Sequence, residues 1–377
     1  MNPLVELQKH GQSFWYDNIR RSLLEDGTIS QMIEEDGLRG MTSNPSIFEK
    51  AIAGSDDYRD ILSAGDARQL DASALYERIA VRDIRDAADV LRPVYGRSKG
   101  RDGYVSLEVS PKLAQDTQRT LEEARRLWKT VERPNLMIKV PATPEGVPAV
   151  QQLIAEGINV NVTLLFSQDA YERVAESYMA GLEKLASDGG DLSRVASVAS
   201  FFVSRIDSAV DALLSVRMKA SGSAQEKALL ASLMGKAAIA NARQTYQRYL
   251  RLFNGPRWQA LADRGARTQR VLWASTGAKN PAYRDVVYVE ELIGPDTVNT
   301  LPPATLHAFR DHGRVRASLT ENVDEANATM ETLARLGISM PEVTARLLDD
   351  GVKLFADAFE GLLRAVDKRD RGAALQR

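Results

Sequence analysis

Strand-like and helix-like segments alternate along the chain, and this alternation constrains the fold more than any other feature. Short apolar or alternating runs are each followed by a stretch with apolar residues at helical spacing. Such a pattern is typical of a parallel sheet with crossover helices. The predicted strands are residues 13–17, 38–42, 103–109, 135–140, 158–166, 195–203, 269–275 and 297–301.

Eight such units in 377 residues favour a closed (β/α)8 barrel, the TIM barrel, over an open doubly wound sheet, and no glycine-rich nucleotide motif argues for the open form. The intervals 45–100 and 206–266 contain further helical segments, and no Pro/Gly/Ser-rich linker isolates them. We therefore expect helical insertions, the second before the seventh strand, in a single domain spanning residues 1–377. Residues 340–366 predict a long amphipathic helix with the length to close over one barrel end.

Charge and composition exclude several classes of function. The 49 Lys and Arg residues nearly balance 51 Asp and Glu residues, so no global field draws the chain to nucleic acid or to an anionic membrane. With no cysteine and three histidines, disulfides, thiol nucleophiles and Cys/His zinc sites are excluded. We expect neither a cofactor nor a metal, although a carboxylate-only Mg²⁺ site stays open.

The N-terminus resembles no signal peptide, and no run reaches the roughly 18 apolar residues of a membrane span. We therefore expect a cytoplasmic protein that binds no membrane. A homo-oligomer stays open.

Alternation along each strand predicts which side chains point into the barrel, because helices cover the outer face and require apolar residues there. Lys139 lies between the outward-facing Ile138 and Val140 and must point inward. In the fifth strand the outward residues are Ile158, Val160, Val162 and Leu164. The polar residues predicted to point inward are Asp17, Glu108, Lys139, Asn161 and Thr163. These should converge near the C-terminal ends of the strands, where barrel active sites lie.

An inward lysine and two carboxylates fit one type of chemistry. Partial desolvation favours the uncharged amine of Lys139, which is a nucleophile for carbonyl carbon and forms a Schiff base. The iminium accepts the electrons of a neighbouring C–C bond, and Asp17 or Glu108 can take the hydroxyl proton of the leaving aldehyde. Each residue alone also has a structural interpretation: Lys139 as a snorkelling or paired lysine, Asp17 as a strand-end cap, and the rest as hydrogen-bonded filler. Because these polar residues are all predicted to point into the barrel from several strands, a functional site is favoured.

Further polar residues follow other strands. Asn44 precedes Pro45 at an expected helix start and also ends the second strand, so it can be both a cap and a ligand. Ser200 and Arg205 belong to the sixth unit and Lys279 to the seventh, the region where barrels often bind phosphate. Singly, each is typical of a surface or capping residue.

Four segments together resemble the transaldolase family, the class I Schiff-base enzymes of the non-oxidative pentose phosphate pathway. They are TSNPS (42–46), MIKVPAT (137–143), GINVNVTLLFS (157–167) and SFFVSRID (200–207). The resemblance extends over essentially the whole chain, and the helical insertion looks like that of the longer bacterial branch.

The resemblance implies a role for each candidate. Lys139 would form the imine, Asp17 would act as the general acid/base, and Glu108 with Thr163 would hold the catalytic water. The substrate-binding residues would be Asn44, Asn161, Ser200, Phe202, Arg205, Ser275 and Lys279. Shorter family members have an arginine two residues after the serine of the seventh strand, whereas here Gly277 has that place and Lys279 is the nearest cation.

The implied reaction transfers a dihydroxyacetone unit from sedoheptulose 7-phosphate or fructose 6-phosphate to glyceraldehyde 3-phosphate or erythrose 4-phosphate. Two alternatives stay open. A fructose 6-phosphate aldolase would use the same Schiff base and release free dihydroxyacetone. A silent sugar-phosphate binding barrel would use Lys139 only as a phosphate contact.

Overall fold

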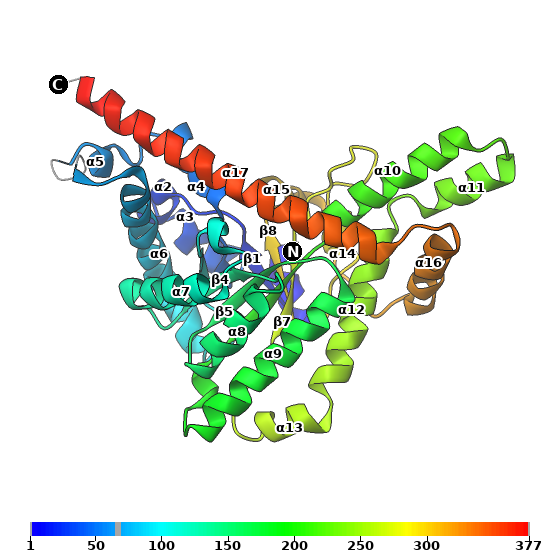
Figure 1. Cartoon of the computed structure of the whole chain (residues 1–377), viewed down its shortest axis with the longest axis horizontal. Helices are drawn as coiled ribbons and strands as arrows, with labels where there is room; N and C mark the ends of the chain where they lie inside the picture. Colours follow the sequence, from blue (N-terminus) through cyan, green and yellow to red (C-terminus); the bar gives the residue numbers. More distant parts are fainter. Residues whose placement is uncertain (1, 65–68, 376–377) are drawn as a thin grey trace.

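A closed parallel barrel forms the centre of the molecule. The computed structural model describes residues 2–64 and 69–375, and within them the strands pair in chain order from β1 to β8, with β8 closing on β1 (Figure 1). The strands are β1 (Gln12–Tyr16), β2 (Gly40–Met41), β3 (Tyr104–Glu108), β4 (Leu136–Pro141), β5 (Val160–Leu165), β6 (Ser197–Phe202), β7 (Arg270–Ala274) and β8 (Thr297–Leu301). The predicted barrel and its eight strands are confirmed.

Helices surround the barrel and extend beyond it. The α-helices are α1 (Pro3–Glu6), α2 (Arg21–Glu25), α3 (Thr28–Glu35), α4 (Pro45–Gly54), α5 (Arg59–Leu62), α6 (Ala72–Arg97), α7 (Thr117–Val131), α8 (Gly146–Ala155), α9 (Gln168–Ser187), α10 (Ser204–Ala220), α11 (Ala224–Leu233), α12 (Ala237–Phe253), α13 (Pro256–Ala262), α14 (Val287–Glu290), α15 (Pro303–His312), α16 (Val323–Arg335) and α17 (Met340–Leu375). The 3-10 helices are η1 (Leu7–His10), η3 (Pro111–Leu113) and η4 (Leu192–Arg194).

Local capping explains where several of these helices begin. The Asp116 side chain accepts a hydrogen bond from the Arg119 amide at 2.9 Å and starts α7, and Ser167 caps α9 through the Ala170 amide at 3.0 Å. Such side chains satisfy amides that have no partner within the helix. A helix start can therefore be read from a few residues.

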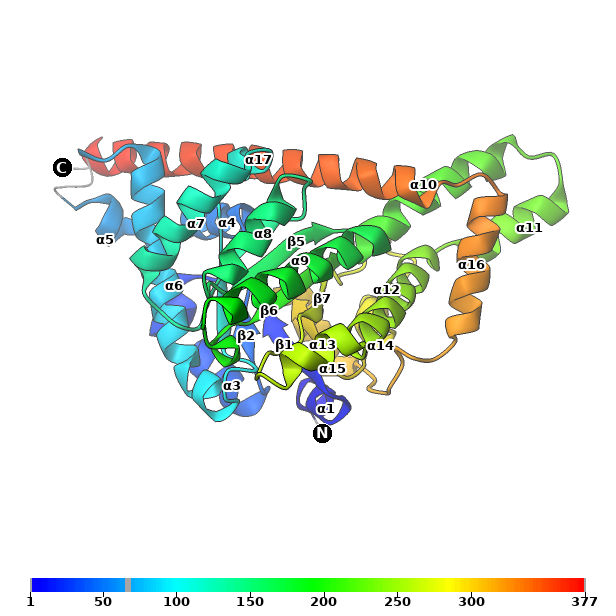
Figure 2. The ribbon, with the colours of Figure 1, turned by 60° about the horizontal axis from the view of Figure 1, so that its bottom comes forward.

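The two long intervals consist of helices. Residues 45–100 contain α4, α5 and α6, apart from 65–68, which lie outside the described residues, and α10 to α13 precede β7. Helices α10 and α11 form an arm that projects from the body in both ribbon views (Figures 1 and 2). The insertion before β7 is thus helical, as predicted.

The last helix, α17, crosses the barrel end where the strands finish. It packs on α4 and α6 at one end and on α10 at the other, and it contacts β5 between them (Figure 2). It runs from Met340 to Leu375 and is longer than the predicted 340–366.

The β2 strand is shorter than predicted and lies against the Trp15 ring. The sequence predicts a strand over 38–42, but only Gly40 and Met41 join the ladder. Gly40 faces the Trp15 ring, and a Cβ at this position would lie 2.5 Å from a ring atom. A glycine is therefore needed where the indole fills the interior.

A bulge in β5 breaks the predicted alternation. Val162 pairs with Ala199, but the next pair is Leu165 with Phe201, so β5 contains one extra residue. Leu164 has φ 62°, and its side chain lies against Gly351 of α17. The prediction that Leu164 faces outward is wrong, because an inserted residue shifts the alternation, and Leu165 takes the outward place.

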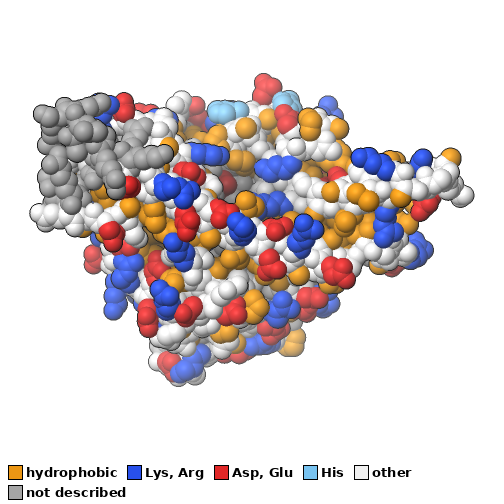
Figure 3. All heavy atoms as spheres, turned by 45° about the horizontal axis from the view of Figure 1, so that its top comes forward, with side chains coloured by type: hydrophobic (Ala, Val, Ile, Leu, Met, Phe, Trp, Pro, Cys, Tyr) orange, Lys and Arg blue, Asp and Glu red, His pale blue; other side chains and the backbone are white. Residues whose placement is uncertain are grey.

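Positive and negative side chains are interspersed on the face shown in Figure 3, in keeping with the net charge of −2. No helix in the described residues is long and apolar enough to cross a membrane.

Candidate functional site

A cavity of about 510 Å³ opens at the C-terminal ends of the strands, bordered by the first turns of several helices and by α17. Most of the predicted site residues line it: Asp17, Asn44, Lys139, Thr163, Ser200, Phe202, Arg205, Ser275 and Lys279. Glu108 and Asn161 do not line it but contact residues that do. The barrel thus brings together side chains from all parts of the sequence.

Lys139 lies at the inner end of this cavity and is only 5% exposed. Its Nζ donates a hydrogen bond to the Ser43 carbonyl oxygen at 3.1 Å and lies 3.2 Å from Glu108 Oε2. The ring of Phe355, from α17, lies over the amine at 5.5 Å. The lysine is therefore both paired and shielded from bulk water, and its amine still borders the cavity.

Register explains why Glu108, Lys139 and Asn161 meet. Glu108 is the ladder partner of Lys139, and Lys139 is the partner of Asn161. Partners in a parallel ladder point to the same side of the sheet, so all three face the barrel interior.

Both carboxyl groups near Lys139 have a raised pKa. Burial raises the pKa of Glu108 and of Asp17, and the nearby charge of Lys139 opposes this rise in each. The Thr42 hydroxyl also donates to Asp17 Oδ1 at 2.6 Å, which favours the ionised form. The site therefore holds two carboxyl groups that bind a proton more readily than free side chains, as acid/base catalysis requires.

Asn161 and Thr163 follow each other on the inner face of β5 but differ in their partners. Asn161 donates to Ser106 Oγ at 2.9 Å and accepts from Ser200 Oγ at 2.6 Å, so its amide is held on both sides. Thr163 is fully buried, and its hydroxyl has no hydrogen-bond partner in the described part of the chain. An unpartnered buried hydroxyl that borders a cavity is a group that a ligand or a water would satisfy.

Asn44 caps α4 and also lines the cavity, so both interpretations of this residue hold. Its side-chain oxygen accepts from the Ile47 amide at 3.1 Å. The amide nitrogen has no protein partner among the described residues and can donate to a ligand.

Three cations that line the cavity, Lys50, Arg205 and Lys279, lack a carboxylate partner within the described residues. Within the described residues neither Arg205 nor Lys279 forms an ion pair, and burial lowers the pKa of both. The charge of Arg205 lowers the pKa of Lys279 further, and Lys50 adds to this effect. Three positive groups facing one cavity favour an anionic ligand such as a phosphate.

Several residues of the site were not predicted as members. Thr42 and Ser106 face inward and orient Asp17 and Asn161, and alternation along their strands could have identified them. Lys50 lies on α4 and Phe355 on α17, and no local pattern connects either with Lys139.

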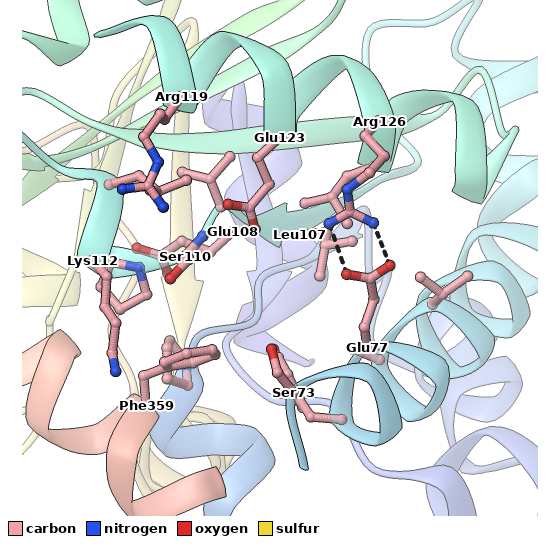
Figure 4. A pocket seen from close by; sticks show the side chains of 18 of the residues that line it. Ser73, Glu77, Leu107, Glu108, Ser110, Lys112, Arg119, Glu123, Arg126 and Phe359 are labelled. Atoms are coloured by element: carbon pink, nitrogen blue, oxygen red, sulfur yellow. Dashed lines mark hydrogen bonds and ion pairs between the residues drawn. The ribbon is translucent and has the colours of Figure 1, made fainter. Parts of the chain in front are cut away.

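A second cavity, of about 630 Å³, lies on the other side of Glu108, between α6, α7 and the side of α17 (Figure 4). Its polar side chains largely satisfy one another: Arg126 pairs with both carboxylate oxygens of Glu77, and Glu123 accepts from the Ser110 amide at 3.2 Å. Lys139 does not line it, so we assign the chemistry to the first cavity.

In the described residues no group of three or more His, Cys, Asp or Glu side chains is placed to hold a metal ion.

The chain is similar in sequence to known transaldolases over nearly its whole length. The family model for "Transaldolase/Fructose-6-phosphate aldolase" matches residues 14–366. A transaldolase from Thiobacillus denitrificans is 52% identical over 366 residues, 97% of this chain and 100% of that protein. A transaldolase from Trichodesmium erythraeum is 47% identical over 370 residues, 98% of this chain and 97% of its own. One from Thermobifida fusca is 48% identical over 366 residues, 97% of each chain.

Proposed function

The chain belongs to the transaldolase/fructose-6-phosphate aldolase family, and we propose that it acts as a transaldolase through a Schiff base on Lys139. The observation that carries this proposal is a buried amine beside a carboxylate, in a cavity that is also lined by Lys50, Arg205 and Lys279, which form no ion pair in the described residues. The amine matches a ketose carbonyl, and the cations match the phosphate that donors and acceptors share.

Imine formation uses Lys139, Glu108 and Thr163. The uncharged amine attacks C2 of a ketose phosphate, and the resulting carbinolamine loses its hydroxyl as water to give the iminium. Glu108, 3.2 Å from the amine, carries protons to and from this water. The unpartnered Thr163 hydroxyl orients the water. The same groups act in reverse when the product imine is hydrolysed.

Bond cleavage uses Asp17. Its carboxylate takes the proton of the C4 hydroxyl, the C3–C4 bond breaks, and the bond electrons pass to the iminium and form an enamine on Lys139. The aldose phosphate leaves, and a second aldose phosphate is attacked by the enamine while Asp17 returns the proton. Burial raises the pKa of Asp17, which makes it a better base than an exposed aspartate.

The remaining residues bind the substrate. Asn44 and Asn161 contact the dihydroxyacetone part, and Ser200 and Phe202 contact the rest of the chain. The phosphate lies near Arg205, Ser275 and Lys279. The donors are sedoheptulose 7-phosphate and fructose 6-phosphate, and the acceptors are glyceraldehyde 3-phosphate and erythrose 4-phosphate.

Borohydride trapping tests the Schiff base. Reduction in the presence of fructose 6-phosphate should add one three-carbon unit, and peptide mass spectrometry should find it on Lys139. The Lys139→Ala variant should carry no adduct and have no turnover, whereas Lys112→Ala, which alters a lysine of the second cavity, should keep the adduct. An adduct in the Lys139→Ala variant would contradict the assignment of the Schiff base to Lys139.

Acceptor dependence distinguishes the family's two activities. A transaldolase releases little product from fructose 6-phosphate until an aldose phosphate is added, whereas an aldolase releases free dihydroxyacetone without one. Thermal stabilisation by fructose 6-phosphate with no adduct on any lysine would instead indicate a silent binding barrel.

A further inference from the structure

The first residue of the segment that follows β7 is hydrogen-bonded to the first residue of α10. Ser275, the first residue after β7, accepts a hydrogen bond from the Ser204 amide at 3.1 Å, and the hydroxyls of the two serines lie 3.1 Å apart. Ser275 has φ 55°, so the chain turns sharply here. Lys279 follows four residues later and borders the first cavity.

The same segment is fastened to α10 again farther along, by two aspartates one helical turn apart. Asp207 accepts from the Tyr288 hydroxyl at 2.7 Å, and Asp211 accepts from the Tyr283 hydroxyl at 2.6 Å. Positions i and i+4 lie on one face of a helix, so both carboxylates face the segment. Lys279 is therefore in a loop whose two ends are both attached to α10.

The start of α12 completes this arrangement. The second oxygen of Asp207 accepts from the Ala238 amide at 2.7 Å, and that of Asp211 accepts from the Gly235 amide at 3.0 Å. Each carboxylate thus joins α10 to one backbone amide and one tyrosine. Asp207 and Asp211 are both buried, and the two hydrogen bonds of Asp207 are buried as well, whereas those of Asp211 are partly buried.

Gly235 shows how closely these elements approach. It has φ 70°, and a Cβ on it would lie 2.8 Å from the Tyr283 ring. Only a glycine fits between the ring and the start of α12 in this conformation.

The charges in the cavity explain why the loop that contains Lys279 needs these hydrogen bonds. Arg205, at the start of α10, and Lys279 line the same cavity, and the charge of Arg205 lowers the pKa of Lys279. Two like charges repel, and neither has a carboxylate partner within 4 Å in the described residues. The attraction of Asp17 for Lys279 is smaller than the repulsion by Arg205, so the charges alone favour moving Lys279 out into water, and other contacts of the loop oppose this movement.

We propose that the hydrogen bonds from Tyr283 to Asp211 and from Tyr288 to Asp207 position Lys279 beside Arg205 and thereby set the affinity for the phosphate group of the substrate. These four side chains, Asp207, Asp211, Tyr283 and Tyr288, do not line the cavity in which the substrate would bind. They are therefore positioning residues. The inference rests on the proposed function, because it assigns the phosphate of that reaction to these two cations.

The test removes each hydroxyl and keeps each ring. In Tyr283→Phe and Tyr288→Phe, KM for fructose 6-phosphate should rise roughly 3- to 10-fold at an almost unchanged kcat, about the effect of one hydrogen bond. The kcat/KM for unphosphorylated fructose should stay at the wild-type value. Binding of inorganic phosphate, measured by calorimetry, should weaken by a similar factor.

Tyr246→Phe is the matched control, because the Tyr246 hydroxyl donates to the Pro295 carbonyl oxygen at 2.9 Å, outside the cavity. It should lose stability without a change in phosphate binding. If Tyr288→Phe does not fold, Tyr283→Phe still decides, since Tyr283 is only half-buried.

Unchanged phosphate binding in the folded variants, or an equal loss with fructose and fructose 6-phosphate, would overturn the positioning role. Phosphate calorimetry requires no turnover, so it tests this role even if borohydride finds no adduct on Lys139. Failure of the proposed function and failure of this inference are therefore distinguishable.

Discussion

Lys139 and Glu108 are direct partners across the ladder of β3 and β4, and Glu108 Oε2 lies 3.2 Å from Lys139 Nζ. Burial raises the pKa of Glu108, whereas the positive charge of Lys139 lowers it. The carboxyl group can therefore exchange a proton with the groups around the amine, whereas an amide of the same shape cannot.

We expect Glu108→Gln to lower the rate of imine formation by roughly 10²- to 10⁴-fold, the usual contribution of general acid/base catalysis. Rapid-quench borohydride trapping measures this rate directly. Glu123→Gln is the control, since Glu123 borders only the second cavity and should leave the rate near that of the wild type. Equal rates in Glu108→Gln and the wild type would remove Glu108 from this step.

The hydrogen bond from Thr42 to Asp17 predicts a shift in pH dependence. Burial already raises the pKa of Asp17, and the Thr42 hydroxyl lowers it by stabilising the carboxylate. In Thr42→Val this stabilisation is lost, so the pKa rises further and a higher pH is needed to ionise the base. The acid limb of kcat/KM should move to higher pH.

Thr120→Val is a suitable comparison for this profile, because the Thr120 hydroxyl donates to the Leu113 carbonyl oxygen and does not contact Asp17. Its acid limb should coincide with that of the wild type. A limb that stays in place or moves to lower pH in Thr42→Val would contradict Asp17 as the base.

Phe355 covers the amine of Lys139 from α17, and its loss should admit water. The enamine is stable only while water and its protons are kept away, so Phe355→Ala should release more free dihydroxyacetone per transfer event. Product analysis with and without acceptor measures this ratio. Leu354→Ala changes the neighbouring residue, which is 52% exposed, and should keep the wild-type ratio. An unchanged ratio in Phe355→Ala would show that α17 does not exclude water.

A buried ion pair between Arg270 and Asp102 lies at the end of the barrel opposite the first cavity, and it contributes to stability. Arg270 donates to Asp102 at 2.8 Å and to Ser13 at 2.8 Å. Asp102→Asn leaves a buried guanidinium without its counter-charge and should lower the free energy of unfolding by about 3–5 kcal/mol. Asp89→Asn, which breaks an exposed pair with Arg133, should cost about 0–1 kcal/mol. Chemical denaturation compares the two.

The same pair should make stability depend on pH. Burial raises the pKa of Asp102, but the charge and hydrogen bonds of Arg270 outweigh it and hold the pKa below its usual range. The unfolded state therefore binds protons first as the pH falls. The contribution of Asp102 should be complete above the usual carboxyl pKa and lost at lower pH, and Asp102→Asn should lack this part of the dependence.

Much of the barrel could be predicted because its signals are local. The two-residue period of a strand is visible in a few residues, so Lys139 points to the side opposite Ile138 and Val140, and the helices that cover the apolar side place Lys139 inside. The bulge at Leu164 was not predictable in this way, because an extra residue is stabilised by packing on α17 and leaves no local pattern.

Three features can be read from the order of residues: the alternation of strands and helices, the inward direction of Lys139 and Glu108, and the capping position of Asn44. Each depends on covalent geometry and near neighbours. Tertiary packing places Phe355 over the amine and brings Lys279 and Arg205 to one cavity. The position of Phe355 depends on how a distant helix packs and leaves no trace in the residues around Lys139. The sequence predicts that Arg205 and Lys279 share one region of the barrel, but not the effect of one charge on the other.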